Sequence, residues 1–161
     1  MPPTLELLVL VRDAANRYEL WSEIVCAVIE QESAWDPWAL RYEPAFYQRY
    51  VQPQVSRGSI NNETEARARA FSWGLMQVMG QVAREHGFAA RSLTELCEPA
   101  TGLDVGCRVL TAKLAAAKGN MVRALLLWNG GGNRDYPAAV MARAAHYAVV
   151  PQISSLMKST R

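Results

Sequence analysis

Hydrophobic residues recur at helical spacing along most of the chain. Near its start, Leu8, Val11 and Ala15 fall on one face of a predicted helix over residues 5–18, with Thr4 as its N-cap. The same kind of spacing predicts further helices over residues 23–33, 63–70, 73–86, 99–118, 121–128 and 137–150, and a short turn over 93–96, with Ser22, Asn62 and Ser92 as caps. We therefore predict an all-α, mainly helical fold.

Two segments interrupt the helical pattern. Residues 36–61 contain several prolines and aromatic residues and are predicted to be irregular, with residues 52–60 as the place for a small hairpin. Residues 129–133 read Asn-Gly-Gly-Gly-Asn and predict a loop, because glycine permits positive φ. We expect one helical domain over residues 1–161 with an irregular excursion in its first half.

Composition narrows the possible functions. The chain has 161 residues, half of them hydrophobic, with 17 Lys and Arg against 15 Asp and Glu, a net charge of +2. So small an excess argues against a dedicated nucleic-acid binder. His86 and His146 lie far apart and the three cysteines show no C-x-x-C spacing, so we expect no metal or other cofactor. Free thiols are favoured over a disulfide between Cys97 and Cys107.

The first eleven residues are apolar but do not have the features of a secretory signal. They carry Glu6, lack a positively charged start and run into Arg12 without a small-residue cleavage site. No apolar stretch approaches the roughly 20 residues needed to span a bilayer, so we expect no membrane insertion. The prediction is a protein made in the cytoplasm without a secretion signal.

Two glutamates end the second predicted helix. Glu30 and Glu32 are two residues apart and so point to different faces, and one of them is expected to face the interior or a cleft. A carboxyl group beside apolar walls has a raised pKa and suits general acid catalysis. Trp35 and Trp38 follow closely, and aromatic rings stack well on sugars. The alternative is a solvent-exposed glutamate with tryptophans in the core.

Two later segments also carry candidate binding groups. Gly74 at an apolar helix start indicates close approach of a ligand or of another element. Gln77 must satisfy its amide, either on a substrate or on the backbone. Trp128 and Asn129 then precede the glycine loop.

In this order, three motifs resemble those of the lysozyme-like lytic transglycosylases of the soluble-lytic-transglycosylase (SLT) type. They are Glu32-Ser33 with Pro37-Trp38-Ala39, then Gly74-Leu75-Met76-Gln77, then Trp128-Asn129-Gly130-Gly131. The resemblance covers about residues 20–145, and the long segment between the first two motifs is similar to phage-associated members. It implies a lysozyme-like fold, peptidoglycan glycan strands as the partner, no cofactor and, as the favoured state, a monomer.

The resemblance also implies roles for individual residues. Glu32 would be the catalytic residue, protonating the bond between N-acetylmuramic acid and N-acetylglucosamine and then acting as a base, so that a 1,6-anhydro sugar forms without water. The implied substrate-binding residues are Ser33, Trp35, Tyr42, Ser72, Trp73, Gly74, Met76, Gln77, Trp128 and Asn129. Without a secretion signal, the enzyme is expected to reach the cell wall by a phage-type or other export route.

One departure from the family pattern keeps alternatives open. The family has tyrosine where this chain has Trp128, and Tyr136 or Tyr147 are the candidates to replace its hydroxyl. A muramidase that hydrolyses the same bond is the alternative enzyme, and it needs a second carboxylate. The candidates for that carboxylate are Asp36, Glu43, Glu63 and Glu65. A peptidoglycan-binding protein without catalytic activity is the third possibility.

Overall fold

The computed structural model describes residues 3–149 and is mainly helical, as the sequence predicts. The α-helices are α1 (Leu5–Arg17), α2 (Ser22–Ser33), α3 (Pro44–Phe46), α4 (Gln52–Ser56), α5 (Glu63–Arg69), α6 (Gly80–Glu85), α7 (Pro99–Ala116), α8 (Met121–Trp128) and α9 (Tyr136–Val149). A π-helical turn, η1 (Tyr47–Val51), and a 3₁₀ turn, η2 (Leu93–Cys97), complete the helical part. The strands are β1 (Leu40–Tyr42), β2 (Phe71–Trp73) and β3 (Val78–Met79).

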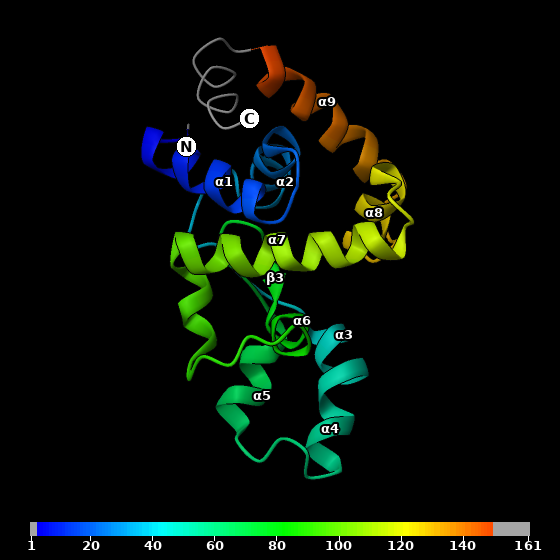
Figure 1. The fold of residues 1–161 in the computed structure, drawn as a ribbon. Helices are drawn as coiled ribbons and strands as arrows, with labels where there is room; N and C mark the ends of the chain where they lie inside the picture. The colour runs from blue at the N-terminus through cyan, green and yellow to red at the C-terminus, as the bar shows by residue number, and fades with distance from the viewer. Residues whose placement is uncertain (1–2, 150–161) are drawn as a thin grey trace.

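Helix α7 crosses the middle of the molecule and separates two groups of elements (Figure 1). Helices α1, α2 and α9 lie on one side of it, with α8 near its C-terminal end, while β3 and helices α3 to α6 lie on the other. Helix α2 packs against both α1 and α9, and α7 packs against α1 and α8. The C-terminal end of α2 and the start of α9 are thereby brought together.

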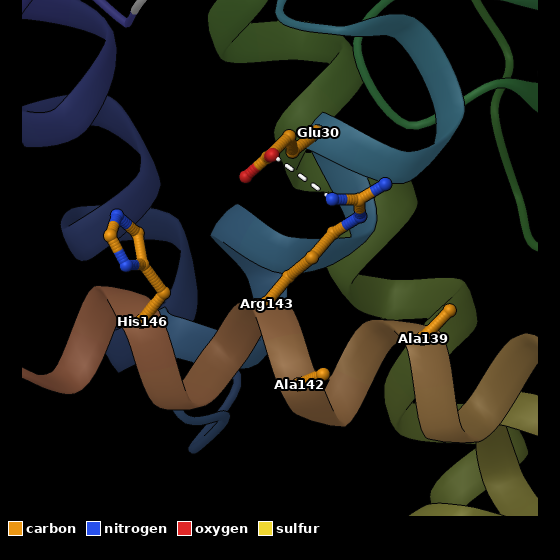
Figure 2. A pocket seen from close by; sticks show the side chains of 5 residues that line it. All are labelled: Glu30, Ala139, Ala142, Arg143 and His146. Atoms are coloured by element: carbon orange, nitrogen blue, oxygen red, sulfur yellow. Dashed lines mark hydrogen bonds and ion pairs between the residues drawn. The ribbon is translucent and has the colours of Figure 1, made fainter.

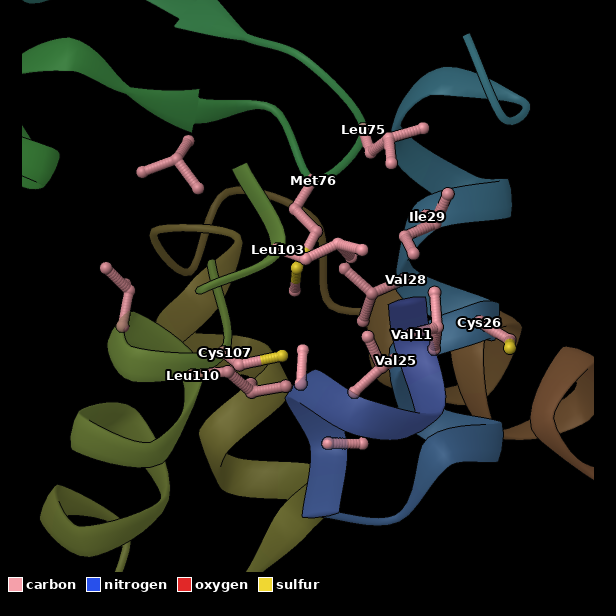
Figure 3. Close-up of a cluster of buried hydrophobic side chains, with 14 of the residues drawn as sticks. Val11, Val25, Cys26, Val28, Ile29, Leu75, Met76, Leu103, Cys107 and Leu110 are labelled. Carbon is pink, nitrogen blue, oxygen red and sulfur yellow. The ribbon is translucent and has the colours of Figure 1, made fainter. Parts of the chain in front are cut away.

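The main core lies between α1, α2 and α7 (Figure 3). Val25 and Val28 of α2 face Leu110 of α7, and all three are fully buried. Met76, from the turn after β2, enters the same cluster and packs directly on Gly106 of α7. A Cβ atom at position 106 would collide with the Met76 side chain. The core therefore fixes the turn after β2 against α7 and against α2, the helix that carries Glu32.

Two sequence predictions are wrong, one in the small sheet and one in the segment that joins β1 to β2. The strand order of the sheet is β1-β2-β3, antiparallel throughout. The helix predicted over residues 73–86 begins only at Gly80, because residues 71–79 form two strands joined by a turn with positive φ at Gly74 and Gln77. The hairpin predicted over residues 52–60 is wrong: this segment begins with helix α4.

The segment predicted to be irregular is largely ordered. Besides β1 it contains α3, η1 and α4, and Pro44 and Pro53 lie in the first turns of the two helices, where proline needs no amide hydrogen. Val51 anchors the segment in a second small core. This core consists of Val51, Ile60, Ala66 and Ala70. Burial of Val51 and Ile60 against Ala66 and Ala70 explains the order, and Val51 and Ile60 lie too far apart in the sequence for a local pattern to reveal it.

Three of the predicted caps are present and one is not. Thr4 accepts from Leu7 at 3.2 Å, Asn62 caps α5, and Ser92 forms a capping box with Glu95. Ser22 is instead the first residue of α2 and is buried, so its hydroxyl does not cap that helix. Helix α9 begins at Tyr136 in place of Pro137, and its predicted last residue, position 150, lies outside the described residues.

The cysteines are free thiols, and all three are buried. Cys97 and Cys107 therefore do not form a disulfide. Over residues 3–149, no three His, Cys, Asp or Glu side chains gather in a way that could hold a metal ion. None of the helices in this range combines the length and the apolar character that crossing a membrane requires.

Candidate active site

Glu32 lies in the last turn of α2, where two other helices meet it. The Tyr136 hydroxyl, from the first residue of α9, donates to Glu32 Oε1 at 2.6 Å. The Trp128 Nε1–H, from the last residue of α8, donates to the same oxygen at 3.1 Å. No residue between 3 and 149 donates a hydrogen bond to Oε2. The carboxyl group is therefore held in place through Oε1, while Oε2 receives no hydrogen bond from residues 3–149.

The loop between α8 and α9 sets the distance between these two donors. Gly130 and Gly131 adopt φ of 71° and 77°, which turns the chain sharply after Trp128. Asn129 closes the loop, since its Nδ2 donates to the Asn133 carbonyl at 2.9 Å. The predicted loop is thus confirmed, and Asn129 supports it from within.

Burial raises the pKa of Glu32, because few water molecules can hydrate its charged form. The hydrogen bonds from Tyr136 and Trp128 and the charge of Arg41 act in the opposite direction and offset only part of this effect. Burial and the charge of Glu32 also raise the pKa of the Tyr136 hydroxyl, so this group remains a donor. Glu32 is thus a carboxyl group suited to holding and releasing a proton.

Ser33 connects α2 to the turn after β2. Its Oγ lies 2.8 Å from the Leu75 carbonyl oxygen and 3.2 Å from that of Ile29. The hydroxyl is satisfied by protein backbone and fixes the position of the turn beside Glu32. Substrate binding by Ser33 stays a prediction.

The Gly74–Gln77 motif builds that turn. Gln77 Nε2 donates to the carbonyl oxygens of Ala39 and Gly74, both at 2.9 Å, and its Oε1 accepts from the Ser72 hydroxyl at 2.7 Å. A Cβ atom at Gly74 would lie 2.5 Å from the Leu96 carbonyl oxygen, so glycine is required there by the protein itself. Of the two readings of this motif, the structure favours the one in which the Gln77 amide is bonded to backbone.

Of the aromatic residues predicted to bind substrate, Trp128 contacts Glu32, whereas Trp35, Trp73 and Tyr42 have other partners. Trp35 is 3% exposed and donates to the Tyr147 hydroxyl at 3.0 Å, so its ring belongs to the core and offers no open face to a sugar. Trp73 is also buried, and its indole donates to the Ala68 carbonyl. Tyr42 packs on Phe71 with ring centroids 5.0 Å apart.

Two other features border the site and were not predicted from the sequence. A pocket of about 70 Å³ adjoins Trp128, and its lining comprises Val78, Met79, Val82, Val109, Lys113 and Trp128. The exposed side chain of Arg41 forms an ion pair with Glu43 at 2.6 Å. The sequence holds no signal for either, because both depend on the pairing of the short strands.

Glu30 lies on a different face of α2, in another environment. It accepts from the Tyr147 hydroxyl at 2.7 Å and pairs with Arg143 at 3.2 Å. An open pocket of about 410 Å³ adjoins this pair (Figure 2), and its lining comprises Glu30, Ala139, Ala142, Arg143 and His146. Of the two tyrosines considered as partners for Glu32, Tyr136 contacts it, whereas Tyr147 contacts Glu30.

Comparison with known proteins gives one result. The sequence model of the transglycosylase SLT domain matches residues 9–146. This span begins in α1 and ends in α9, and so includes Glu32 and both of its hydrogen-bond donors. Comparisons with curated proteins and with solved structures give no significant match.

Proposed function

The chain belongs to the transglycosylase SLT family, and on this premise we propose that it cleaves the β-1,4 bond between N-acetylmuramic acid and N-acetylglucosamine in peptidoglycan, with Glu32 as acid and then base. One observation carries the proposal. Glu32 is a carboxyl group with a raised pKa whose Oε1 accepts two neutral donors, Tyr136 and Trp128. This arrangement leaves Oε2 to exchange the proton with the substrate.

In the acid step, Glu32 Oε2 transfers its proton to the glycosidic oxygen as the bond to C1 of the muramic acid breaks. Negative charge then develops on the carboxylate, and the hydrogen bonds from Tyr136 and Trp128 strengthen. General acid catalysis of this kind typically contributes about 10²- to 10⁴-fold. The acetamido group of the substrate stabilises the positive charge at C1, which a second carboxylate does in other glycosidases.

In the base step, the Glu32 carboxylate removes the proton from the C6 hydroxyl of the same muramic acid. The freed oxygen forms a bond to C1 and closes the 1,6-anhydro ring, while the proton returns to Glu32. The residue thus ends the cycle as it began, and no water is consumed. One group can serve in both directions because its pKa lies closer to the working pH than that of an exposed glutamate.

The muramidase alternative requires a second carboxylate placed to activate water, and three of the four candidates are held by other groups. Asp36 accepts from the Trp38 amide at 2.9 Å, Glu43 is held by Arg41 at 2.6 Å, and Glu65 is bonded by Arg69 and Arg84. Glu63 lies 3.7 Å from Arg67 and is 83% exposed. These partners support the lyase reaction over hydrolysis.

The products of peptidoglycan digestion test the proposal. Purified cell-wall sacculi are incubated with the protein, and the soluble muropeptides are separated and identified by mass spectrometry. We expect fragments that end in 1,6-anhydro-N-acetylmuramic acid, lighter by one water than fragments with a reducing end. Products with reducing N-acetylmuramic acid would establish the muramidase reaction, and an absence of soluble products would favour the binding protein without activity.

A further inference from the structure

A second pocket lies between helix α5 and strand β2. It has a volume of about 450 Å³, and its lining comprises Glu63, Thr64, Arg67, Ala68, Phe71 and Trp73. Helix α5 lies on the side of α7 away from α2, the helix that carries Glu32 (Figure 1). This pocket, which we call the α5–β2 pocket, takes no part in the reaction described above.

The register of the sheet and the lining of the pocket separate it from the catalytic residue. Arg41 pairs with Ser72, and Ser72 with Met79, so these three side chains share one face. Side chains alternate along a strand, so Phe71 and Trp73 point to the other face. Neither Glu32 nor its two hydrogen-bond donors, Tyr136 and Trp128, line the α5–β2 pocket.

The pocket combines aromatic walls with fixed polar groups. Trp73 is buried and its N–H is bonded to the Ala68 carbonyl, so it forms the floor of the pocket, and the half-buried Phe71, whose ring centroid lies 5.8 Å away, is the aromatic ring open to a ligand. Arg67 is held in place by a hydrogen bond to the Tyr42 hydroxyl at 3.3 Å and by stacking 4.7 Å from the centre of the Tyr47 ring. Its guanidinium therefore loses little conformational freedom when it binds a ligand.

The charges of the pocket point to a neutral ligand. One cation, Arg67, lies 3.7 Å from one anion, Glu63, and the Thr64 hydroxyl adds a donor and acceptor. A phosphate or a carboxylate would be repelled by Glu63 as much as attracted by Arg67. A sugar instead offers an apolar C–H face to the Phe71 ring and hydroxyl or acetamido groups to the charged side chains.

We propose that the α5–β2 pocket binds an N-acetylhexosamine unit of a glycan strand, apart from the catalytic site. The choice of ligand rests on the proposed function, because it assumes that glycan strands are the substrate. A second site for the same polymer raises the local concentration of cleavable bonds near Glu32 without any new contact at the reacting atoms. The pocket thus serves to retain the enzyme on its polymer.

Nuclear magnetic resonance tests this proposal. The experiment uses the Glu32→Gln variant of the whole chain, because this substitution prevents cleavage of the glycan. The ¹⁵N-labelled protein is titrated with chitotetraose, the β-1,4-linked tetramer of N-acetylglucosamine. We expect concentration-dependent shifts of the Thr64 and Phe71 amides. Adding Arg67→Ala lowers the affinity measured at these amides by about fivefold or more, because a charge-assisted hydrogen bond is lost. Phe71→Leu, which keeps apolar volume but removes the ring, lowers it as well.

Arg57→Ala is the matched control, since Arg57 is an exposed arginine at the end of α4 and does not line the pocket. It should leave the affinity at the pocket unchanged, and the spectra themselves report whether each variant is folded. Shifts confined to residues around Trp128, or an affinity unaffected by Arg67→Ala, would overturn the proposal. So would shifts caused by the peptidoglycan stem peptide and not by chitotetraose. Because the readout is binding, a protein that fails to cleave peptidoglycan can still pass or fail this test.

Discussion

Glu30 and Glu32 stand two residues apart on the same helix, yet the structure gives them different partners. Each accepts a hydrogen bond from a tyrosine of α9, at 2.7 Å from Tyr147 and at 2.6 Å from Tyr136. The second partner differs: Glu30 has the guanidinium of Arg143, and Glu32 has the neutral indole of Trp128. The comparison isolates what makes a glutamate suitable for proton transfer.

A cation compensates the charge of a carboxylate, whereas a neutral donor only replaces part of its hydration. Glu30 therefore belongs to a structural ion pair, and the pocket of about 410 Å³ beside it (Figure 2) is larger than the pocket of about 70 Å³ beside Trp128. Among residues 3–149, no cation is hydrogen-bonded to Glu32, and burial raises its pKa. The size of a neighbouring pocket is thus a poorer guide to the catalytic residue than the charge of its partners.

The largest loss of activity is expected when Glu32 itself is substituted. Glu32→Gln keeps the size of the side chain and an oxygen that can accept from Tyr136 and Trp128, but it cannot release a proton. We expect the rate of sacculus digestion to fall by about 10²- to 10⁴-fold, the usual contribution of a general acid. Release of soluble muropeptides measures the rate.

Glu30→Gln is the matched control for this variant. It makes the same chemical change two residues away, and digestion should proceed within about twofold of the parent rate, since Glu30 is not in contact with the reacting groups. Equal losses of activity in the two variants would show that the helix end as a whole, and not one proton-carrying side chain, supports catalysis.

The tyrosines of α9 sharpen the comparison. Tyr136→Phe removes the first and shorter donor to Glu32, which stabilises the charged form. Loss of a hydrogen bond to a charged group should lower the maximal rate by about tenfold or more. It should also raise the pKa of Glu32 further. Because the acid step needs protonated Glu32, the alkaline limb of the pH–rate profile moves to higher pH.

Tyr147→Phe removes the equivalent hydroxyl from the Glu30 arrangement. Trp35 then loses its acceptor, so we expect a loss of stability of about 1–3 kcal/mol with no shift of the pH profile. Urea denaturation measures the loss of stability, and initial rates across a pH series measure the pH profile. A shift of the alkaline limb to lower pH in Tyr136→Phe would refute the assigned role of the hydroxyl.

A smaller loss of rate, with a smaller shift of the alkaline limb to higher pH, is expected when the Trp128 indole is replaced. Trp128→Phe removes the donor at 3.1 Å, which ranks behind Tyr136 in lowering the pKa of Glu32. The rate should fall by about fivefold, which corresponds to one ordinary hydrogen bond, and the alkaline limb should move less than in Tyr136→Phe. Trp128→Tyr, which restores the residue typical of the family, serves as the control and should retain more activity than Trp128→Phe. The reverse order would show that the indole ring, and not its N–H group, matters.

The parts of this site that local sequence determines were predicted correctly. Helical spacing located α2, and with it the end of the helix that carries Glu32. The glycines after Trp128 predicted the loop that separates the two donors. The sequence also offered Tyr136 and Tyr147 as candidates to replace the missing hydroxyl, but it could not decide between them, since the packing of α9 on α2 determines which one reaches Glu32.

The sheet could not be predicted because its information is not local. Leu40 pairs with Trp73, 33 positions later, and strands of two or three residues are too short for an alternating pattern. The same pairing determines which face Arg41 and Trp73 occupy. The motifs alone also do not show that Trp35, predicted to bind substrate, is buried, because its burial depends on packing against Tyr147 of α9.

The smallest effect concerns the cation that distinguishes Glu30. Arg143→Met keeps the apolar stem but removes the ion pair with Glu30 and the hydrogen bond to Gln31. Both members of the ion pair are about one-third exposed or more, so solvent screens it and the loss of stability should stay below about 1 kcal/mol. Urea denaturation measures this loss, and the digestion rate and pH profile should match the parent. A fall in rate as large as that of Trp128→Phe would mean that the Glu30 pair positions Glu32 through α2, and the two glutamates would then have to be treated as one coupled unit.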